Sequence, residues 1–433
     1  MAKIFKAFML LLLLGVLVLL AIIFVPVQKT APLSTLPATH EDSIALGKYM
    51  ADASDCMACH TAEGGKPFAG GRPITTDMGV IWTTNITPDK ETGIGHYTLD
   101  DFRAALYDGL RKDGKHLYPA MPYENYRKLS EEDVRAMYAY FMQEVEPVNN
   151  NVQESQLDFP FNQRWGMRVW NWVHLEKAGF TPPANANEQI KRGAYLVQGA
   201  GHCAACHSPR TYFMGQKGIT EQDASFLTGG ELDGWLAPDL RGATSATVQW
   251  SVEDMHDYLS TGRNAHSTAT GEMVLVIRDS LQYLTKEDNT AIAVYLKSIS
   301  DKSQESVAKE TSPSETQLSL TKASPDMPLG ARLYLDNCGG CHFVTGLGAP
   351  EIFPKLSGNS LVNAPNPKAL IHLILYGAEL PSTELRPAKL RMPGFDWRLS
   401  NEEVAELATF VRKAWGNDSG KVSPDEVATL RQN

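Results

Sequence analysis

The pattern Cys-x-x-Cys-His occurs three times in this chain of 433 residues. Its copies are Cys56-Met57-Ala58-Cys59-His60, Cys203-Ala204-Ala205-Cys206-His207 and Cys338-Gly339-Gly340-Cys341-His342. The chain has six cysteines, and all of them fall inside these copies. No cysteine is therefore left for a disulfide, a catalytic thiol or a separate metal cluster.

This spacing is the attachment pattern of c-type haem. Two thiols add across the porphyrin vinyl groups, and the adjacent imidazole can ligate the iron from one side. A zinc site would need further ligands, and a redox dithiol does not explain a histidine after the second cysteine each time. The sequence therefore predicts three covalently bound haem c groups. They are expected on Cys56, Cys59, Cys203, Cys206, Cys338 and Cys341, with His60, His207 and His342 as iron ligands.

The amino terminus carries an uninterrupted apolar run from Ala7 to Val25, preceded by Lys3 and Lys6. This run is long enough to cross a bilayer, and no small-residue cleavage pattern follows it. We expect residues 7–27 to form an uncleaved anchor with a cytoplasmic amino terminus, a removed signal peptide being the alternative. Since bacteria attach haem c outside the cytoplasmic membrane, the haem-bearing part is expected on the periplasmic side of that inner membrane.

Similar helical segments surround each motif. A short amphipathic segment with a glycine near a tyrosine precedes each copy, which suits a close crossing with another helix. These segments are 44–50, 190–197 and 329–335, with Gly47, Gly193 and Gly330. A second helical stretch, ending at a glycine, follows at 99–109, 252–262 and 369–377.

A third helix closes each repeat and begins at a hydroxyl residue followed three positions later by an acid, which is the capping-box pattern. The hydroxyl residues are Ser130, Thr285 and Ser400. Ala136, Ala291 and Glu406 occupy one equivalent position of these helices. Each repeat covers about 100 residues, a normal domain size.

The repeats predict a mainly α protein with haem domains at 43–146, 188–300 and 325–418. Residues 301–324 are rich in Ser, Thr, Lys and Glu and are expected to be a flexible, solvated linker. Residues 419–433 are expected to be a tail. The connector at 147–187 instead contains Phe159, Phe161, Trp165, Trp170 and Trp172. We favour burial of these rings between the first two domains, with docking to a partner subunit as the alternative.

A methionine lies between the second and third helix of every repeat and can supply the ligand opposite the histidine. Met121, Met273 and Met392 follow their histidines by 61, 66 and 50 residues (60 to 121, 207 to 273 and 342 to 392). His116 and His266 are competing ligands, and His372 is expected to pack inside its helix. Arg72, Arg210 and Arg386 are candidate partners for haem propionates.

The net charge and the methionines limit the classes of partner and function that the chain can have. The net charge of −10 excludes a nucleic-acid partner, which would require a basic patch. A methionine in every ligand loop leaves no iron open for substrate, so we expect an electron-transfer protein. A multi-haem peroxidase and an oxidase-linked cytochrome subunit are the alternatives.

Several longer stretches resemble the tri-haem cytochrome c subunits of membrane-bound bacterial dehydrogenases. They are Thr84-Asn85-Ile86-Thr87-Pro88-Asp89-Lys90-Glu91-Thr92-Gly93-Ile94-Gly95, Tyr118-Pro119-Ala120-Met121-Pro122-Tyr123, Phe161-Asn162-Gln163-Arg164-Trp165, Gly201-His202-Cys203-Ala204-Ala205-Cys206-His207-Ser208-Pro209-Arg210, Gly229-Gly230-Glu231-Leu232-Asp233-Gly234-Trp235 and Met392-Pro393-Gly394-Phe395. The similarity runs from about residue 43 to the end. The long anchor departs from members that lose a signal peptide, and residues 343–346 lack the Gly-x-Asp-Gly often found after the third motif.

This resemblance implies three tandem class I cytochrome c-type domains after an N-terminal transmembrane helix. It also implies a separate catalytic dehydrogenase subunit, which is a quinoprotein, a flavoprotein or a molybdoprotein. Electrons would pass through the three haems to ubiquinone in the membrane or to an oxidase. The chain itself would hold no catalytic residues.

Overall fold

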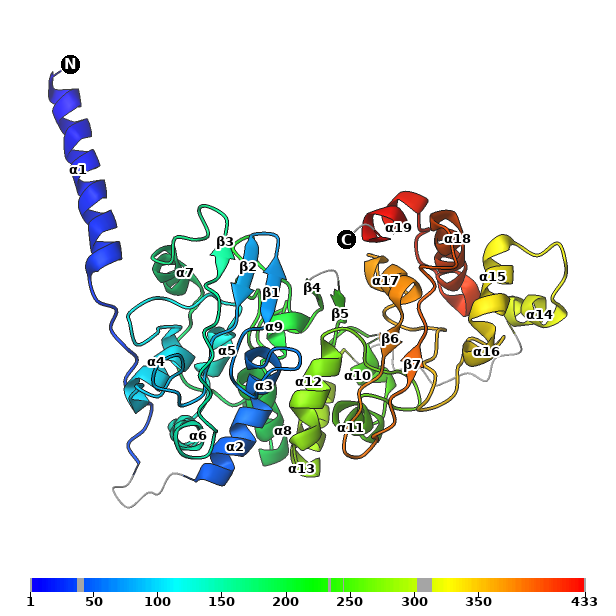
Figure 1. The fold of residues 1–433 in the computed structure, drawn as a ribbon, viewed down its shortest axis with the longest axis horizontal. Coiled ribbons are helices and arrows are strands. Elements are labelled where there is room, and N and C mark those ends of the chain that lie inside the picture. The colour runs from blue at the N-terminus through cyan, green and yellow to red at the C-terminus, as the bar shows by residue number, and fades with distance from the viewer. Residues whose placement is uncertain (1, 37–42, 233–234, 244, 302–313, 432–433) are drawn as a thin grey trace. The chain divides into compact units, whose positions relative to one another are not determined.

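The computed structural model describes residues 2–36, 43–232, 235–243, 245–301 and 314–431, and it is mainly helical (Figure 1). The chain divides into two compact units. The first consists of Met1–Thr181, Gln198–His202 and Arg210–Gln216, and the second of Pro182–Val197, Cys203–Pro209 and Lys217–Asn433. The first repeat therefore lies in the first unit, and the third repeat and most of the second share the other. The division into three domains stays a prediction.

The amino-terminal helix α1 (Ala2–Phe24) is long and apolar enough to cross a membrane. Its 23 residues correspond to about 35 Å at a rise of about 1.5 Å per residue, compared with a hydrocarbon core of about 30 Å. The most apolar 18-residue window of Lys3–Phe24 has a mean hydropathy of 3.2, and none of this window is buried within the protein. A membrane anchor or a signal sequence both fit this helix.

The segment after α1 is fastened to the first unit. Lys29 Nζ forms an ion pair with Asp101 Oδ1 at 2.6 Å. The main-chain N–H of Thr30 donates to Asp108 Oδ2 at 2.8 Å, and its hydroxyl donates to Oδ1 at 2.5 Å. Both acceptors lie on one helix of that unit, so the chain leaves α1 along a defined path.

The first unit combines helices with a small antiparallel sheet. Its helices after α1 are α2 (Ile44–Ala53), α3 (Cys56–His60), α4 (Leu99–Asp108), α5 (Tyr123–Tyr126), α6 (Glu131–Gln143) and α7 (Gly166–His174). Its strands are β1 (Pro73–Thr76), β2 (Gly79–Trp82) and β3 (Gln156–Leu157), in the order β1-β2-β3. Ile74 faces Ile81 across the first pair, and Gly79 faces Leu157 across the second.

The part of the second unit that contains the second motif holds helices and one strand pair. The helices are α8 (Glu188–Tyr195), α9 (Ala204–His207), α10 (Ala246–Gln249), α11 (Val252–Thr261), α12 (Met273–Asp279), the 3₁₀ turn η2 (Leu281–Tyr283) and α13 (Lys286–Ile299). The π-helical turn η1 (Leu196–Ala200) follows α8, and its residues from Gln198 on belong to the first unit. The strands β4 (Gly230–Leu232) and β5 (Trp235–Ala237) pair antiparallel.

The part with the third motif is built in the same way. Its helices are α14 (Glu315–Lys322), α15 (Leu329–Asn337), α16 (Gly339–His342), α17 (Lys368–Tyr376), α18 (Asn401–Val411), the 3₁₀ turn η3 (Ala414–Gly416) and α19 (Pro424–Arg431). The strands β6 (Ala378–Glu379) and β7 (Arg391–Met392) pair antiparallel. Inside the second unit, Asn366 binds the carboxylate of Glu231 at 2.8 Å, and the ring of His372 packs on Trp235.

The predicted close helix crossing is confirmed in all three repeats. Helix α2 packs on α6, α8 on α13, and α15 on α18. A Cβ atom at Gly47 would lie 1.9 Å from the carbonyl oxygen of Ala136, and one at Gly193 would lie 2.0 Å from that of Ala291. At Gly330 the carbonyl oxygen of Glu406 would be 2.4 Å away. Only glycine allows the two helices to approach so closely.

The predicted caps are also confirmed. The hydroxyls of Ser130, Thr285 and Ser400 accept hydrogen bonds from the N–H groups three residues on. Ser400 forms the complete capping box with Glu403. The second helix of every repeat ends at a glycine with positive φ, namely Gly109, Gly262 and Gly377.

Two connecting segments differ from their predictions. Residues 302–313 of the expected linker lie outside the described residues, but 315–322 form α14, whose Leu320 is buried in the core of the third repeat. The expected tail forms α19, and Val422 and Val427 join the same core. The described end of the expected linker and the expected tail each contain a short helix that the sequence did not predict, and buried apolar side chains attach both helices to this core.

The predicted burial of the aromatic connector was wrong for most of its rings. Phe159, Phe161, Trp165 and Trp172 are all exposed. Trp170 is half-buried, and its ring packs edge-on against Tyr123 of the first unit. The first unit therefore uses one of these five rings for its own packing.

Segments 198–202 and 210–216 belong to the first unit through a buried polar network. Asn125 Nδ2 donates to the carbonyl of Gln198 at 2.9 Å, and Gln216 Nε2 donates to Asn125 Oδ1 at 2.7 Å. The carboxylate of Glu124 accepts a bond from the main chain of Gln216 at 3.3 Å. Burial raises the pKa of Glu124 to about 7, even though the positive charge of the nearby Arg210 acts to lower it.

The glycine crossing gives a direct test. Gly47→Ala should destabilise the first unit by about 1–3 kcal/mol or more, because the added methyl group overlaps the Ala136 carbonyl. Gly166→Ala is the control, since a Cβ there meets nothing within 4 Å. Thermal unfolding followed by circular dichroism in detergent should show a lower midpoint for Gly47→Ala alone. Equal midpoints would contradict the close crossing.

Candidate haem attachment sites

Each motif occupies a short helical turn that brings its two cysteines to one side. Helix α3 contains both cysteines of the first motif, and α9 and α16 begin one residue after the first cysteine of theirs. Residues three apart in a helix lie on the same face. Five of the six cysteines are half-buried, and Cys341 is exposed. At each motif, therefore, two thiols lie close enough together to bond to a single group.

The imidazole of each motif histidine is held by a main-chain carbonyl. The Nδ1 atom of His60 lies 2.6 Å from the Thr84 oxygen. The same atom of His207 lies 2.8 Å from the Pro238 oxygen, and that of His342 lies 3.0 Å from the Pro354 oxygen. A hydrogen bond at Nδ1 fixes the tautomer and leaves Nε2 as the ligating atom.

Burial lowers the pKa of all three histidines, although the carbonyl bond opposes this shift. The rings are therefore neutral at neutral pH, and neutral imidazole is the form that binds a metal. Burial also keeps the thiol of the first cysteine of each motif protonated. Burial raises the pKa of Cys203 and Cys338 to about 12, and it raises that of Cys56 even further.

Two cysteines and one histidine per motif fall short of the four ligands that a structural zinc site requires. Among the described residues, no group of three or more His, Cys, Asp or Glu side chains could hold a metal ion. The residues present therefore fit a haem group at each motif, bound through two cysteines and ligated by the histidine.

A glycine also forms a hydrogen bond with the main-chain carbonyl of each motif histidine, and the sequence did not predict this contact. The N–H groups of Gly70, Gly229 and Gly348 donate to the carbonyls of the three motif histidines at 2.7, 2.8 and 3.3 Å. All three glycines have positive φ, which other residues rarely adopt.

These glycines also touch the segment that supplies the imidazole's acceptor. A Cβ at Gly70 would lie 2.4 Å from the carbonyl carbon of Thr84, and one at Gly348 would lie 2.2 Å from the oxygen of Phe353, next to Pro354. At Gly229 the nearest atom is the nitrogen of Asp239, 3.1 Å away and next to Pro238. The loop after each motif therefore contacts the histidine at two points, its ring through a main-chain carbonyl and its main chain through the glycine. Proline at two of the three acceptor positions was the signal that could have revealed it.

The three methionines proposed as second ligands occupy different local structures. Met121 lies in a turn before α5, Met273 begins α12, and Met392 ends β7. All three are half-buried. Their role as ligands stays a prediction.

The loops that carry the first two methionines follow one path. Leu117 N–H donates to the carbonyl of Gly109, and Ala269 N–H donates to that of Gly262, both at 2.7 Å. Each methionine stands four residues after that contact. The third loop differs, because Met392 itself pairs with Ala378, directly after the helix-ending Gly377.

The competing histidines have other surroundings. His116 is buried, and burial lowers its pKa. His266 stacks on Trp250 and lies 3.5 Å from Asp254. His372 packs between Trp235 and Tyr376, which confirms that it packs with its helix.

The candidate propionate partners differ in position. Arg72 donates to the carbonyl of Ala58 inside the first motif at 2.8 Å, so it lies at the attachment site. Arg210 donates to the carbonyl of Met214, and Arg386 forms an ion pair with Glu351 at 2.6 Å. Propionate pairing stays a prediction for all three.

A pair of glycine variants tests the histidine support. Gly70→Ala and Gly71→Ala both place a side chain at positive φ, which costs about 1–2 kcal/mol. Only Gly70→Ala also pushes the Thr84 carbonyl away, because a Cβ at Gly71 meets nothing closer than 3.7 Å. We expect a lower thermal midpoint for Gly70→Ala and a raised reduction potential at one haem, since an imidazole that loses its acceptor is a weaker donor. Identical potentials in the two variants would contradict this support.

Comparison with known proteins places these features in a family. The family profile of cytochrome c matches residues 44–144 and 328–415. The chain is 41% identical to the gluconate 2-dehydrogenase cytochrome c subunit of Pantoea cypripedii, over 89% of each chain. It is 40% identical to the cytochrome c subunit of the quinone alcohol dehydrogenase of Gluconobacter oxydans, over 90% of this chain and 82% of that one. It is 37% identical to the fructose dehydrogenase cytochrome subunit of Gluconobacter japonicus, over 93% and 85%. The chain therefore belongs to the family of cytochrome c subunits of bacterial dehydrogenases.

Proposed function

We propose that this chain is a membrane-anchored electron-transfer subunit with three haem c groups, which relays electrons from a catalytic dehydrogenase subunit to ubiquinone or the respiratory chain. The observation that carries the proposal is the threefold recurrence of one site. In each copy, two cysteines precede a histidine whose ring is held by a loop carbonyl and whose main chain is held by a glycine. A site built three times in one chain suits a relay.

The proposed ligand set favours electron transfer over catalysis. If Met121, Met273 and Met392 supply the second ligands, each bound iron would hold two protein ligands and would have no free position for a substrate. A bound haem c supplies a one-electron carrier whose potential is raised by histidine and methionine ligation. The chain's part is to hold the ligands, keep the imidazoles neutral and exclude water from one side of each site.

The relatives' names indicate the kind of partner. They name cytochrome subunits of gluconate, alcohol and fructose dehydrogenases. We propose that this chain likewise accepts electrons from a separate subunit that oxidises an alcohol, a sugar derivative or an aldehyde. That subunit is a quinoprotein, a flavoprotein or a molybdoprotein.

The proposed arrangement has three haem domains at 43–146, 188–300 and 325–418, and α1 is retained as an anchor. Shared helix crossings and shared histidine supports favour three equivalent domains. The domains would face the periplasm, since Lys3 and Lys6 precede the anchor.

The function is tested on the complex extracted from native membranes. We expect a large dehydrogenase subunit to co-purify with this chain, and its substrate to reduce the haems. Gluconate, ethanol and fructose are the first substrates to add, and an added ubiquinone analogue should reoxidise the haems. Co-purification with an oxidase alone, or peroxide turnover by this chain alone, would overturn the proposal.

The methionine ligands are tested one at a time. Met121→Ala, Met273→Ala and Met392→Ala should each remove the absorption band of methionine-ligated ferric haem at one site. The potential of that haem should fall by on the order of 0.1 V, because a weaker or missing axial ligand no longer favours the ferrous state. Met137→Leu is the control, since Met137 is buried in the core of the first unit. A variant with an unchanged spectrum would show that its methionine is not a ligand.

A further inference from the structure

Helix α7 exposes large apolar side chains, whereas an ordinary surface helix exposes polar ones. Trp172 and Val173 are 64% and 72% exposed, and Trp165 and Val169 are exposed on the same face. These positions follow the spacing i, i+4, i+7 and i+8 of a single helical stripe. On the inner side, Asn171 donates to the carbonyl of Asp108 at 2.9 Å and accepts from the hydroxyl of Tyr123 at 3.0 Å.

The apolar surface extends beyond the helix. Phe159 and Phe161, just before α7, are exposed. The loop 210–216 also belongs to the first unit, and its tip carries Tyr212 and Phe213, which are 93% and 66% exposed. The indole N–H of Trp170 donates to the carbonyl of Phe213 at 2.8 Å and so joins the loop to α7. An exposed apolar loop tip next to an exposed apolar helix face is typical of a contact with a membrane or with another protein.

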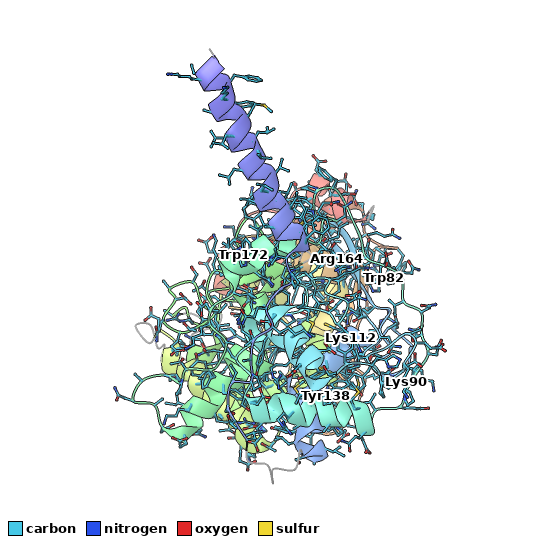
Figure 2. The ribbon with its side chains drawn as sticks, turned by 90° about the vertical axis from the view of Figure 1, so that its left-hand side faces the viewer. Trp82, Lys90, Lys112, Tyr138, Arg164 and Trp172 are labelled. Carbon is cyan, nitrogen blue, oxygen red and sulfur yellow. The ribbon has the colours of Figure 1, made fainter. Side chains whose placement is uncertain are left out.

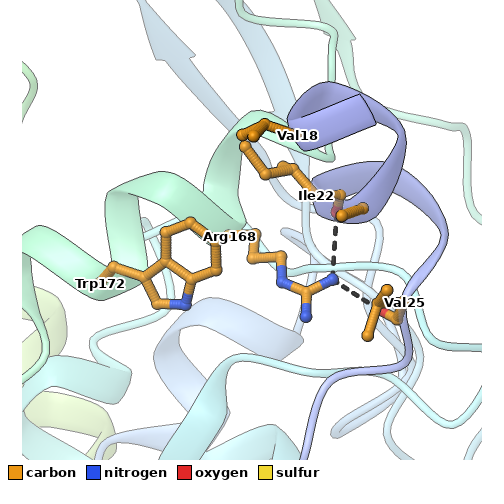
Figure 3. A pocket seen from close by; sticks show the side chains of 6 residues that line it. Val18, Ile22, Val25, Arg168 and Trp172 are labelled. Atoms are coloured by element: carbon orange, nitrogen blue, oxygen red, sulfur yellow. Dashed lines mark hydrogen bonds between the residues drawn. The ribbon is translucent and has the colours of Figure 1, made fainter. Parts of the chain in front are cut away.

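This surface adjoins the end of the membrane helix. The guanidinium of Arg168 donates to the carbonyls of Ile22 and Val25 at 3.1 and 2.5 Å (Figure 3). Trp172 lines a shallow apolar pocket together with the last turns of α1 (Figure 3). Figure 2 shows Trp172 close to the end of α1 that enters the first unit. Since α1 is only slightly longer than the hydrocarbon core, an α1 that spans the bilayer would place α7 at the level where the chain leaves the lipid.

The charges of this segment fit a lipid surface. Residues 159–175 contain Arg164 and Arg168 but no Asp or Glu, in a chain whose net charge is −10. Both guanidinium groups are bonded within the first unit, that of Arg164 to the carbonyl of His116 and that of Arg168 to those of Ile22 and Val25. The segment contains no acidic side chain that would repel anionic headgroups, and tryptophan and tyrosine gather at the membrane interface. A protein partner on the same face would have to enter the headgroup layer around α1.

We propose that α7, residues 159–165 and the loop 210–216 rest in the headgroup region of the bilayer that α1 enters, as a second, monotopic membrane contact. This surface is here called the lipid-facing patch. The inference rests on the retention of α1 that the proposed function assumes. The contact holds the first haem-binding unit against the lipid, which is where a lipid-soluble electron acceptor is found.

Photo-crosslinking of the full chain in native membranes tests the patch. The photoreactive variant Trp172→p-benzoylphenylalanine is compared with the same replacement of Trp397, which is 78% exposed but lies in the second unit. The same replacement at Val173 and at Tyr212 covers the case in which one variant is not produced. Intact-mass analysis of the purified chain reads the adduct and also shows whether α1 is present.

If the lipid-facing patch touches the bilayer, the variant with the photoreactive residue at position 172 should gain the mass of one phospholipid. The variant with the same residue at position 397 should show no such gain. A crosslink from position 172 to another protein chain, or no phospholipid adduct at 172, 173 or 212 while α1 is present, would overturn the proposed membrane contact. A chain that lacks α1 would instead refute the anchor of the proposed function, and lipid adducts at 172 in such a chain would still support the patch.

Discussion

The hydrogen bond between each motif histidine and a loop carbonyl is the interaction on which the three sites depend. It joins a five-residue motif to an acceptor 12 to 31 residues away in the sequence, as His342 with Pro354 and His207 with Pro238 show. One such bond contributes only about 1 kcal/mol to stability, so its main effect is on orientation. It selects the tautomer with a free Nε2, and the glycine bonded to the histidine main chain holds the same loop from the other side.

The helical frame around the sites depends on a second constraint, the close crossing of two helices at glycine. Gly47, Gly193 and Gly330 meet the equivalent carbonyls of α6, α13 and α18. The helix before each motif is thereby fixed against the last helix of its repeat. The motif that follows this first helix is thereby positioned by packing, and the long loops that come after the motif supply the other ligands of the proposed sites.

The sequence predicted the regular parts of the structure well, because their causes are local. The glycine near a tyrosine, the hydroxyl caps at Ser130, Thr285 and Ser400 and the glycine helix ends are all readable from spacing, and the structure confirms them. Main-chain acceptors such as the Thr84 carbonyl carry no side-chain signal, so they could not be predicted. The helices α14 and α19 were missed because Leu320 and Val427 bury against a core that is formed elsewhere in the chain. The predicted burial of the aromatic connector failed for a different reason. Its composition indicates that the rings favour an apolar environment, but it does not indicate whether that environment is a protein core, a partner protein or a membrane.

The haem content of the full chain tests the central claim most directly. The account holds that one site geometry recurs three times and that each copy binds one haem through its two cysteines. Intact-mass measurement of the chain purified from native membranes should therefore show the polypeptide with three covalently attached haems. The paired replacement of both cysteines in any one motif by alanine should remove one haem and leave two. A native chain that carries two haems, or a motif whose loss does not change the mass, would contradict the account.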